Sequence, residues 1–348
     1  MVEIESGKLL PHSPDFRSIV QLPVKYDSGA SSPELDSFVE SIVPQDCIDL
    51  IWEFLGYCLM PWRELKRILY LVGPPDAGKS TLLTVVFRGL FGEELVAYQT
   101  MHDLANKRFA AAELFGKLVN VAADLDDTPI TSVGILKQVT GGDPISAERK
   151  YGQPFSFVSV ARLIFAANSL PHYRSELGVV AERIIPVPCE NVFVSGVDLD
   201  RDIAMNLSCG SVRSALLNRA LQGAQRLMQR GCFHEPESVK AMRPTHLNTS
   251  DTLALFIRDY VDRHDKEASI SKRDFYDAYC LFCQGKGLHP NTETAVGRRL
   301  RKPPYQFAEG RPVNPGSGKQ EYSWLGVDLN INGRHQYLPQ ARLKSTDS

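Results

Sequence analysis

The sequence predicts an α/β protein with a parallel sheet, preceded by a pair of helices and followed by further helices and a small unit of helices and strands. Two observations carry this prediction. Short apolar runs alternate with helix-like segments between residues 66 and 190, which is typical of a parallel sheet covered by helices. The first of these runs, Ile68–Val72, leads directly into a glycine-rich loop and then into an apolar helical pattern.

The glycine-rich loop fits the pattern G-x-x-x-x-G-K-[ST] at every fixed position. Glycines let the backbone turn its N–H groups toward a phosphate, and the helix behind adds positive potential. Lys79 can then reach the β- and γ-phosphates of a nucleotide, and Ser80 can bind Mg²⁺. The predicted nucleotide-binding residues are Gly73, Pro74, Pro75, Asp76, Ala77, Gly78, Lys79, Ser80 and Thr81.

Carboxylates end the apolar run that begins at residue 117. An acid at the carboxyl end of a strand beside a phosphate loop can hold Mg²⁺ and polarise a water. Asp124 is the first candidate because it directly ends the run, and Asp126 is the second because it points to the same face of an extended chain. The alternative is a solvated acidic turn.

Residues 136 to 157 read as a glycine-rich turn followed by a β-hairpin with a basic, aromatic tip. The tip contains Arg149, Lys150 and Tyr151, and the alternative is an ordinary charged surface turn. Asn168 ends the next buried run, where an amide can orient an attacking water, although Asn also commonly ends strands. Arg183 precedes the last run and can act as an arginine finger toward a neighbouring subunit, or is simply a surface arginine.

Apolar spacing and turn residues divide the chain into six segments. These are a linker (1–33), a helical collar (34–65), the nucleotide-binding core (66–190), a helical lid (191–265), a unit with the element order of a winged helix (266–327) and a loose polar tail (328–348). The second helix of that unit ends in Arg298, Arg299, Arg301 and Lys302, a basic end that can enter a major groove of DNA. The alternative is a unit used for packing or protein contact.

Composition sets limits on partners and compartment. The formal net charge is −2, so any nucleic-acid contact has to come from local basic clusters. Seven scattered cysteines indicate a reducing compartment, and the sequence has no signal peptide and no apolar run of 18 residues. We therefore expect a cytoplasmic protein without a membrane partner.

Taken together, these motifs resemble those of superfamily 3 helicases of the AAA+ class, and in particular the C-terminal helicase part of phage, plasmid and prophage primase-helicases. The resemblance covers nearly the whole chain. Its most specific part is the hairpin segment, because phosphate loops occur in many folds. The segments that carry it read GPPDAGKST, KLVNVAADLD, LKQVTGGDPISAERKYGQPFSF, LIFAANSLP and ERIIPVP.

The resemblance implies an AAA+-like core, ATP and Mg²⁺ as cofactors, and a ring that is expected to be a hexamer. It implies that Lys79, Asp124 or Asp126, Asn168 and Arg183 serve ATP hydrolysis. It also implies that Lys150, with Arg149, faces single-stranded DNA in a central channel. Two departures are visible: Glu182 stands where relatives often carry another arginine, and the acids are separated by one residue instead of being adjacent.

The leading hypothesis is an ATP-dependent DNA helicase or translocase that replicates a mobile element, with single-stranded DNA in the channel and duplex DNA on the winged helix. No primase motif is visible, so a priming domain is expected upstream or on another chain. One alternative is an origin-binding or loading module that uses ATP as an assembly switch. A metabolic phosphate-loop kinase is the third reading, but it leaves the basic hairpin unexplained.

Overall fold

The computed structural model describes residues 1–11, 13–16, 18, 20–60, 64–123, 132–170, 178–193, 202–242, 252–263, 268–286, 290–313 and 318–337. The chain divides into two compact units. Unit 1 comprises residues 1–172 and 179–246, and unit 2 comprises residues 173–178 and 247–348. Each unit has an apolar cluster of its own, so each has an independent core.

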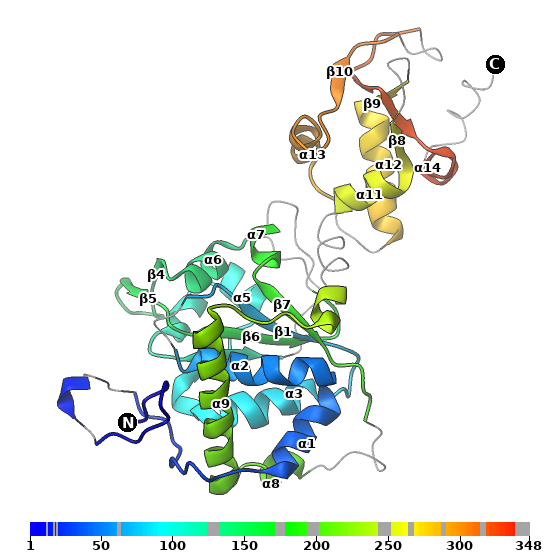
Figure 1. The fold of residues 1–348 in the computed structure, drawn as a ribbon. Helices are drawn as coiled ribbons and strands as arrows, with labels where there is room; N and C mark the ends of the chain where they lie inside the picture. The colour runs from blue at the N-terminus through cyan, green and yellow to red at the C-terminus, as the bar shows by residue number, and fades with distance from the viewer. Residues whose placement is uncertain are drawn as a thin grey trace. The chain divides into compact units, whose positions relative to one another are not determined.

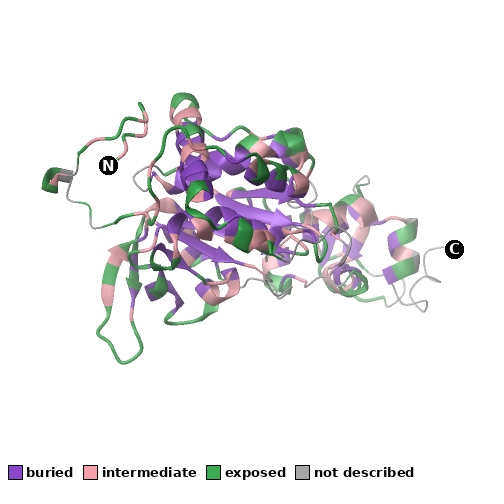
Figure 2. Cartoon of the chain, turned by 90° about the horizontal axis from the view of Figure 1, so that it is seen from below, coloured by how far each residue is buried: buried purple, intermediate pink, exposed green. Residues whose placement is uncertain are grey.

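A five-stranded parallel sheet forms the centre of unit 1, in the order β2-β3-β6-β1-β7. Its strands are β1 (Ile68–Val72), β2 (Val96–Ala97), β3 (Val119–Ala122), β6 (Arg162–Ala167) and β7 (Ile184–Pro188). Every residue of β1, β6 and β7 is buried, which explains why these strands are continuous apolar runs in the sequence. Figure 2 shows the buried strands at the centre of the unit. The predicted parallel α/β sheet is confirmed.

Helices cover this sheet on both sides. Figure 1 shows α2 and α3 on one side of the strands and α6 on the other. The helices of unit 1 are α1 (Pro33–Ile42), α2 (Ile48–Cys58), α3 (Lys79–Leu82), α4 (Gly89–Phe91), α5 (Met101–Asn106), α6 (Gly134–Gly141), α7 (Gly178–Ala181), α8 (Ile203–Asn206) and α9 (Gly210–Arg230). A π-helical stretch, Leu83–Arg88, continues α3 into α4.

Helices α2 and α9 cross so closely that their backbones touch. A Cβ atom added to Gly223 would lie 2.0 Å from the carbonyl oxygen of Trp52, and one added to Gly56 would lie 2.3 Å from the amide nitrogen of Ala224. The apolar residues of both helices belong to the cluster that contains the sheet. The segment expected as a collar and the main helix of the expected lid are therefore packed together within unit 1.

Unit 2 consists of helices packed on two small antiparallel sheets. One sheet has three strands in the order β10-β11-β9, and the other pairs β12 with β8. Its helices are α11 (Thr252–Tyr260), α12 (Lys272–Gly285), α13 (Glu293–Leu300) and α14 (Ile331–Tyr337), and its strands are β8 (Val261–Arg263), β9 (Ser269–Ser271), β10 (Ala308–Gly310), β11 (Ser323–Leu325) and β12 (Val327–Leu329). Ser271 caps α12, because its hydroxyl accepts from the amide of Asp274 at 3.0 Å.

Two segment boundaries differ from those expected from the sequence. Helix α11 falls in unit 2, so the division lies near residue 246 and not at 265. The tail expected to be loose from residue 328 is ordered as far as Tyr337, because Leu329 and Tyr337 are buried in the apolar cluster of unit 2. The ring of Tyr337 packs edge-on at 5.0 Å from that of Tyr260.

No helix in the described part of the chain is both long enough and apolar enough to cross a membrane.

Candidate functional site

The loop between β1 and α3 contains two residues with left-handed backbone. Asp76 and Gly78 have positive φ angles of 59° and 73°. Backbone of this kind directs neighbouring N–H groups toward a common point, which is how a phosphate is bound by main chain. Gly78 has a second reason to lack a side chain, since an added Cβ would lie 2.9 Å from Ile42 and 3.2 Å from Phe193.

The segment that follows β7 fixes the loop from one side. The amide of Cys189 donates to the carbonyl of Val72 at 2.7 Å, and that of Phe193 donates to the carbonyl of Asp76 at 3.0 Å. A Cβ on Gly73 would lie 1.8 Å from the carbonyl oxygen of Cys189, so glycine is required there. Our sequence reasoning missed this support, since no motif marks it.

Cys189 contributes a neutral thiol to this region. Burial raises the pKa of the Cys189 thiol to about 12, although the positive charge of Lys79 acts in the opposite direction. The thiol is therefore uncharged at neutral pH and does not form an ion pair with the lysine.

Lys79 and Asn168 meet at the carboxyl edge of the sheet. The Lys79 ammonium donates to the carbonyls of Gly73 (2.8 Å) and Pro74 (2.6 Å) and to Oδ1 of Asn168 (3.2 Å). Asn168 directly follows β6, and β6 lies beside β1 with Ala167 opposite Val72. Because both strands are parallel, the loop and the amide reach the same edge. The lysine is only 7% exposed, and these acceptors hold it at the place where the loop closes.

The other predicted loop residues differ in exposure. Pro74, Pro75, Asp76 and Ser80 are exposed, Thr81 is half-buried and Ala77 is buried. Ser80, one residue beyond Lys79, is exposed in the first turn of α3. Asp124 and Asp126 lie outside the described residues. The strand before them, β3, pairs with β6 through Ala122 and Phe165, so its carboxyl end opens onto the same edge.

Arg183 lies at the opposite edge of the sheet. It precedes β7, whose first residue, Ile184, is opposite Ile68, the first residue of β1. The phosphate loop begins after the last residue of β1. About six residues of extended chain, roughly 20 Å, therefore separate Arg183 from the loop along the strand direction. An arginine side chain does not span that distance, so Arg183 cannot reach the phosphate loop of its own chain. Its Nη1 instead donates to the carbonyl of Lys137 at 3.0 Å and to Oγ1 of Thr140.

The predicted hairpin is present, formed by β4 (Pro144–Ala147) and β5 (Phe155–Val158). Its tip is exposed, and Tyr151, with a φ angle of 64°, is 96% exposed. The Lys150 ammonium lies 5.1 Å from the centre of the Tyr151 ring. The guanidinium of Arg149 lies 5.7 Å from the ring of Phe155, back along the strand. The two cations of the tip thus have different surroundings.

Two residues that the sequence reasoning missed tie the hairpin to the rest of unit 1. Arg108 pairs with Glu148 at 2.8 Å. The ring of Phe115 packs edge-on against those of Phe155 (5.4 Å) and Phe157 (5.3 Å) and lies 5.9 Å from the Arg149 guanidinium. Phe115 is nevertheless 50% exposed, so this aromatic cluster is a surface feature and not part of the main core.

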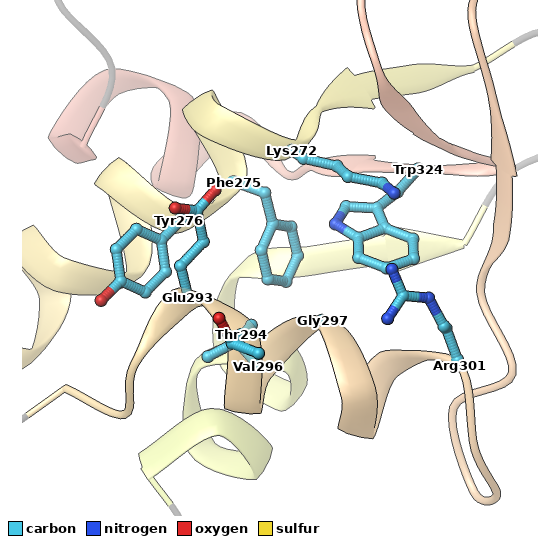
Figure 3. Close-up of a pocket in the computed structure, with 9 residues that line it drawn as sticks. All are labelled: Lys272, Phe275, Tyr276, Glu293, Thr294, Val296, Gly297, Arg301 and Trp324. Carbon is cyan, nitrogen blue, oxygen red and sulfur yellow. The ribbon is translucent and has the colours of Figure 1, made fainter.

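The basic end of α13 is only partly directed to solvent. Arg301 pairs with Glu309 at 2.7 Å and lies over Trp324, which Lys272 also covers at 4.6 Å from the ring centre. Figure 3 shows Lys272 and Arg301 reaching the indole from α12 and from the end of α13, beside a pocket of 270 Å³. Arg299 lies 6.0 Å from the ring of Tyr305, whereas Arg298 and Lys302 are exposed. Arg301 is therefore engaged within its own unit.

Comparisons with known proteins give a fold but no family assignment. Residues 71–179 match DUF5906, a family of unknown function, and this span includes the loop, β3 and the hairpin. No curated protein matches the chain. The apo structure of the NrS-1 C-terminal region (305-718) is similar, with a TM-score of 0.52, 13% identity, and coverage of 87% of this chain and 77% of that chain.

A second structure, the A form of the apo NrS-1 C-terminal region, gives the same TM-score of 0.52 and 13% identity, and covers 87% of this chain and 78% of that chain. At such low identity the likeness concerns the arrangement of helices and strands. The chemistry of the site has to be argued from the residues themselves.

Proposed function

We propose that this chain is an ATP-dependent DNA helicase or translocase that works as a ring, expected to be a hexamer. The observation that carries the proposal is the pairing of two features in one unit. Lys79 and Asn168 meet at a phosphate-binding loop, and an exposed hairpin carries Lys150 and Tyr151 at its tip. A metabolic kinase needs the first feature only.

The residues of the loop fit a nucleotide with Mg²⁺. Left-handed backbone at Asp76 and Gly78 supplies N–H donors, and Lys79, now held by main-chain carbonyls, supplies the cation for the β- and γ-phosphates. Ser80 and Asp124, or Asp126, are the proposed metal ligands. Mg²⁺ in such a site neutralises charge on the phosphates. Asn168 is proposed to orient the attacking water.

Arg183 is proposed to complete the site of a neighbouring copy. Arg183 is too far from the phosphate loop of its own chain to serve the nucleotide proposed there. The nucleotide of an adjacent subunit is the one that it can serve, and this is the reason for proposing a ring.

Unit 2 is proposed to be a winged helix that contacts duplex DNA. Its element order and its three-stranded sheet, in the order β10-β11-β9, support the assignment. Exposed Arg298 and Lys302 are the proposed contacts on α13, together with Arg299, while Arg301 supports the fold through Glu309.

Substitution of Lys79 by alanine tests the proposal. Lys79→Ala should abolish DNA-stimulated ATP hydrolysis and strand displacement on a forked duplex, because Lys79 is the cation that the loop carbonyls and Asn168 hold at the closed end of the loop. Lys240→Ala is the matched control, since among the described residues Lys240 forms a surface pair with Glu237 at 2.6 Å. ATP hydrolysis at the wild-type rate in Lys79→Ala would contradict the assignment. DNA-stimulated hydrolysis without strand displacement by the wild type would favour the alternative, an ATP-switched origin-binding or loading module.

A further inference from the structure

The guanidinium of Arg183 is held at the carboxyl end of α6. Its Nη1 donates to the carbonyl of Lys137 at 3.0 Å and to the hydroxyl of Thr140, which in turn donates to the carbonyl of Leu136 at 2.6 Å. Thr140 is only 5% exposed, so the contact is shielded from water. Thr140 lies in the last turn of α6, and a cation there is favourable because the C-terminal end of a helix carries partial negative charge.

The same end of α6 begins the hairpin. Only Gly142 and Asp143 separate the last residue of α6 from β4, and the amide of Asp143 donates back to the carbonyl of Gln138 at 3.1 Å. Gly142 closes the helix with a φ angle of 74°. Since this connection has two residues and is hydrogen-bonded to the helix, a shift of the last turn of α6 moves the base of the hairpin.

We propose that Arg183 alternates between this position on α6 and the nucleotide phosphate of a neighbouring copy, with Thr140 as the positioning residue that couples ATP hydrolysis to the hairpin. The inference rests on the proposed function. In this proposal the guanidinium moves as a unit, so the two bonds of Nη1 to α6 are given up when a phosphate across the interface is engaged. Engagement across the interface therefore releases the last turn of α6, and with it the base of the hairpin that is proposed to track DNA.

The size of the effect follows from the hydrogen bond at Thr140. Removing the hydroxyl takes away one bond from a charged donor, which shifts the balance between the two positions of Arg183 by about tenfold, or about 1.4 kcal/mol. The position on α6 is weakened, so Arg183 becomes available to the neighbouring site more often, whether or not DNA is present.

Thr140→Val tests the inference, and Thr140→Ser is the matched control because it keeps the hydroxyl. The valine variant should raise ATP hydrolysis in the absence of DNA by up to about tenfold, lower the stimulation by DNA by the same factor, and reduce the base pairs unwound per ATP hydrolysed. The serine variant should behave as the wild type. An unchanged ratio of DNA-stimulated to basal hydrolysis in the valine variant would overturn the coupling.

A second measurement does not depend on the folding of the valine variant. In Arg183→Ala without nucleotide, amide hydrogen exchange in the last turn of α6 and at the base of the hairpin should become about tenfold faster, while exchange in β1 stays unchanged. Equal protection in both proteins would overturn the proposed contact. The two hypotheses remain separable. If Arg183→Ala hydrolyses ATP normally, the proposed finger is wrong. If Arg183→Ala is inactive but Thr140→Val keeps the wild-type ratio of DNA-stimulated to basal hydrolysis, the finger stands and only the coupling through Thr140 is wrong.

Discussion

The two cations at the hairpin tip should respond differently to substitution, since their surroundings differ. The ammonium of Lys150 lies beside Tyr151 at the outermost part of the tip, whereas the guanidinium of Arg149 lies over the rings of Phe115 and Phe155. Lys150→Ala should therefore remove a phosphate contact, while Arg149→Ala should loosen the attachment of the hairpin to Phe115.

The expected magnitude for Lys150 follows from counterion release. Each phosphate contact to a single strand contributes about 0.7 to the slope of log K against log salt. In Lys150→Ala the slope should therefore fall by about 0.7 for each subunit that is engaged with DNA. Between about 50 and 200 mM salt, one contact accounts for roughly a 2.6-fold change in affinity. Basal ATP hydrolysis should stay near the wild-type rate, because Lys150 has no part in the phosphate loop.

Fluorescence anisotropy of labelled single-stranded DNA over a salt series measures the slope, and a forked substrate measures unwinding on the same preparation. Lys240→Ala serves as the control for loss of a surface lysine, and its slope should equal that of the wild type. A wild-type slope together with wild-type unwinding in Lys150→Ala would refute the channel hypothesis for this residue. If Arg149→Ala reduces the slope while amide hydrogen exchange in the hairpin stays unchanged, Arg149 is itself a phosphate contact.

Three further outcomes are expected. Mixing Arg183→Ala with Asp124→Asn should restore part of the ATPase, because a mixed interface pairs an intact finger with an intact carboxylate; no recovery in mixed rings would exclude action across the interface. Gly223→Ala should lower the free energy of unfolding in urea by about 1–3 kcal/mol, because its Cβ would meet the backbone of α2 at 2.0 Å; Gly210→Ala, where no atom lies within 4 Å, should not destabilise the protein. A chain of residues 1–246 should keep DNA-stimulated ATPase but bind duplex DNA less tightly, and loss of hydrolysis would indicate that unit 2 contributes to the site.

Those parts of the fold that depend on local pattern could be predicted from the sequence. The strand Ile68–Val72 and the hairpin strand Phe155–Val158 lie where the apolar and β-like runs indicate. Helix α9 ends where Gly231 follows it with a φ angle of 76°, as a glycine stop predicts. Each of these signals is contained within a few residues, so no knowledge of distant contacts is needed.

Contacts between distant segments were beyond the reach of the same reasoning. The glycines at 56 and 223 look unfavourable in isolated helices, and their purpose is visible only when the two backbones are found in contact. The polar face of α9 likewise reads as solvent-exposed. In the structure Asn218 donates to the carbonyls of Asp27 (2.8 Å) and Ala30 (2.9 Å), and so holds the segment before α1.

The position of Arg183 shows most clearly what topology adds to a motif. In the sequence it is a single arginine before an apolar run, and either a finger or a surface residue. Once β7 is placed beside β1 in a parallel sheet, the phosphate loop lies at the carboxyl edge and Arg183 at the amino edge. If Arg183 takes part in catalysis, it must act on a neighbouring chain. Because it rests on the helix that leads into the hairpin, one side chain links the proposed subunit interface, the proposed nucleotide site and the proposed DNA contact. Coupling among the three then needs no long-range pathway, only a choice between two hydrogen-bonded positions of one guanidinium.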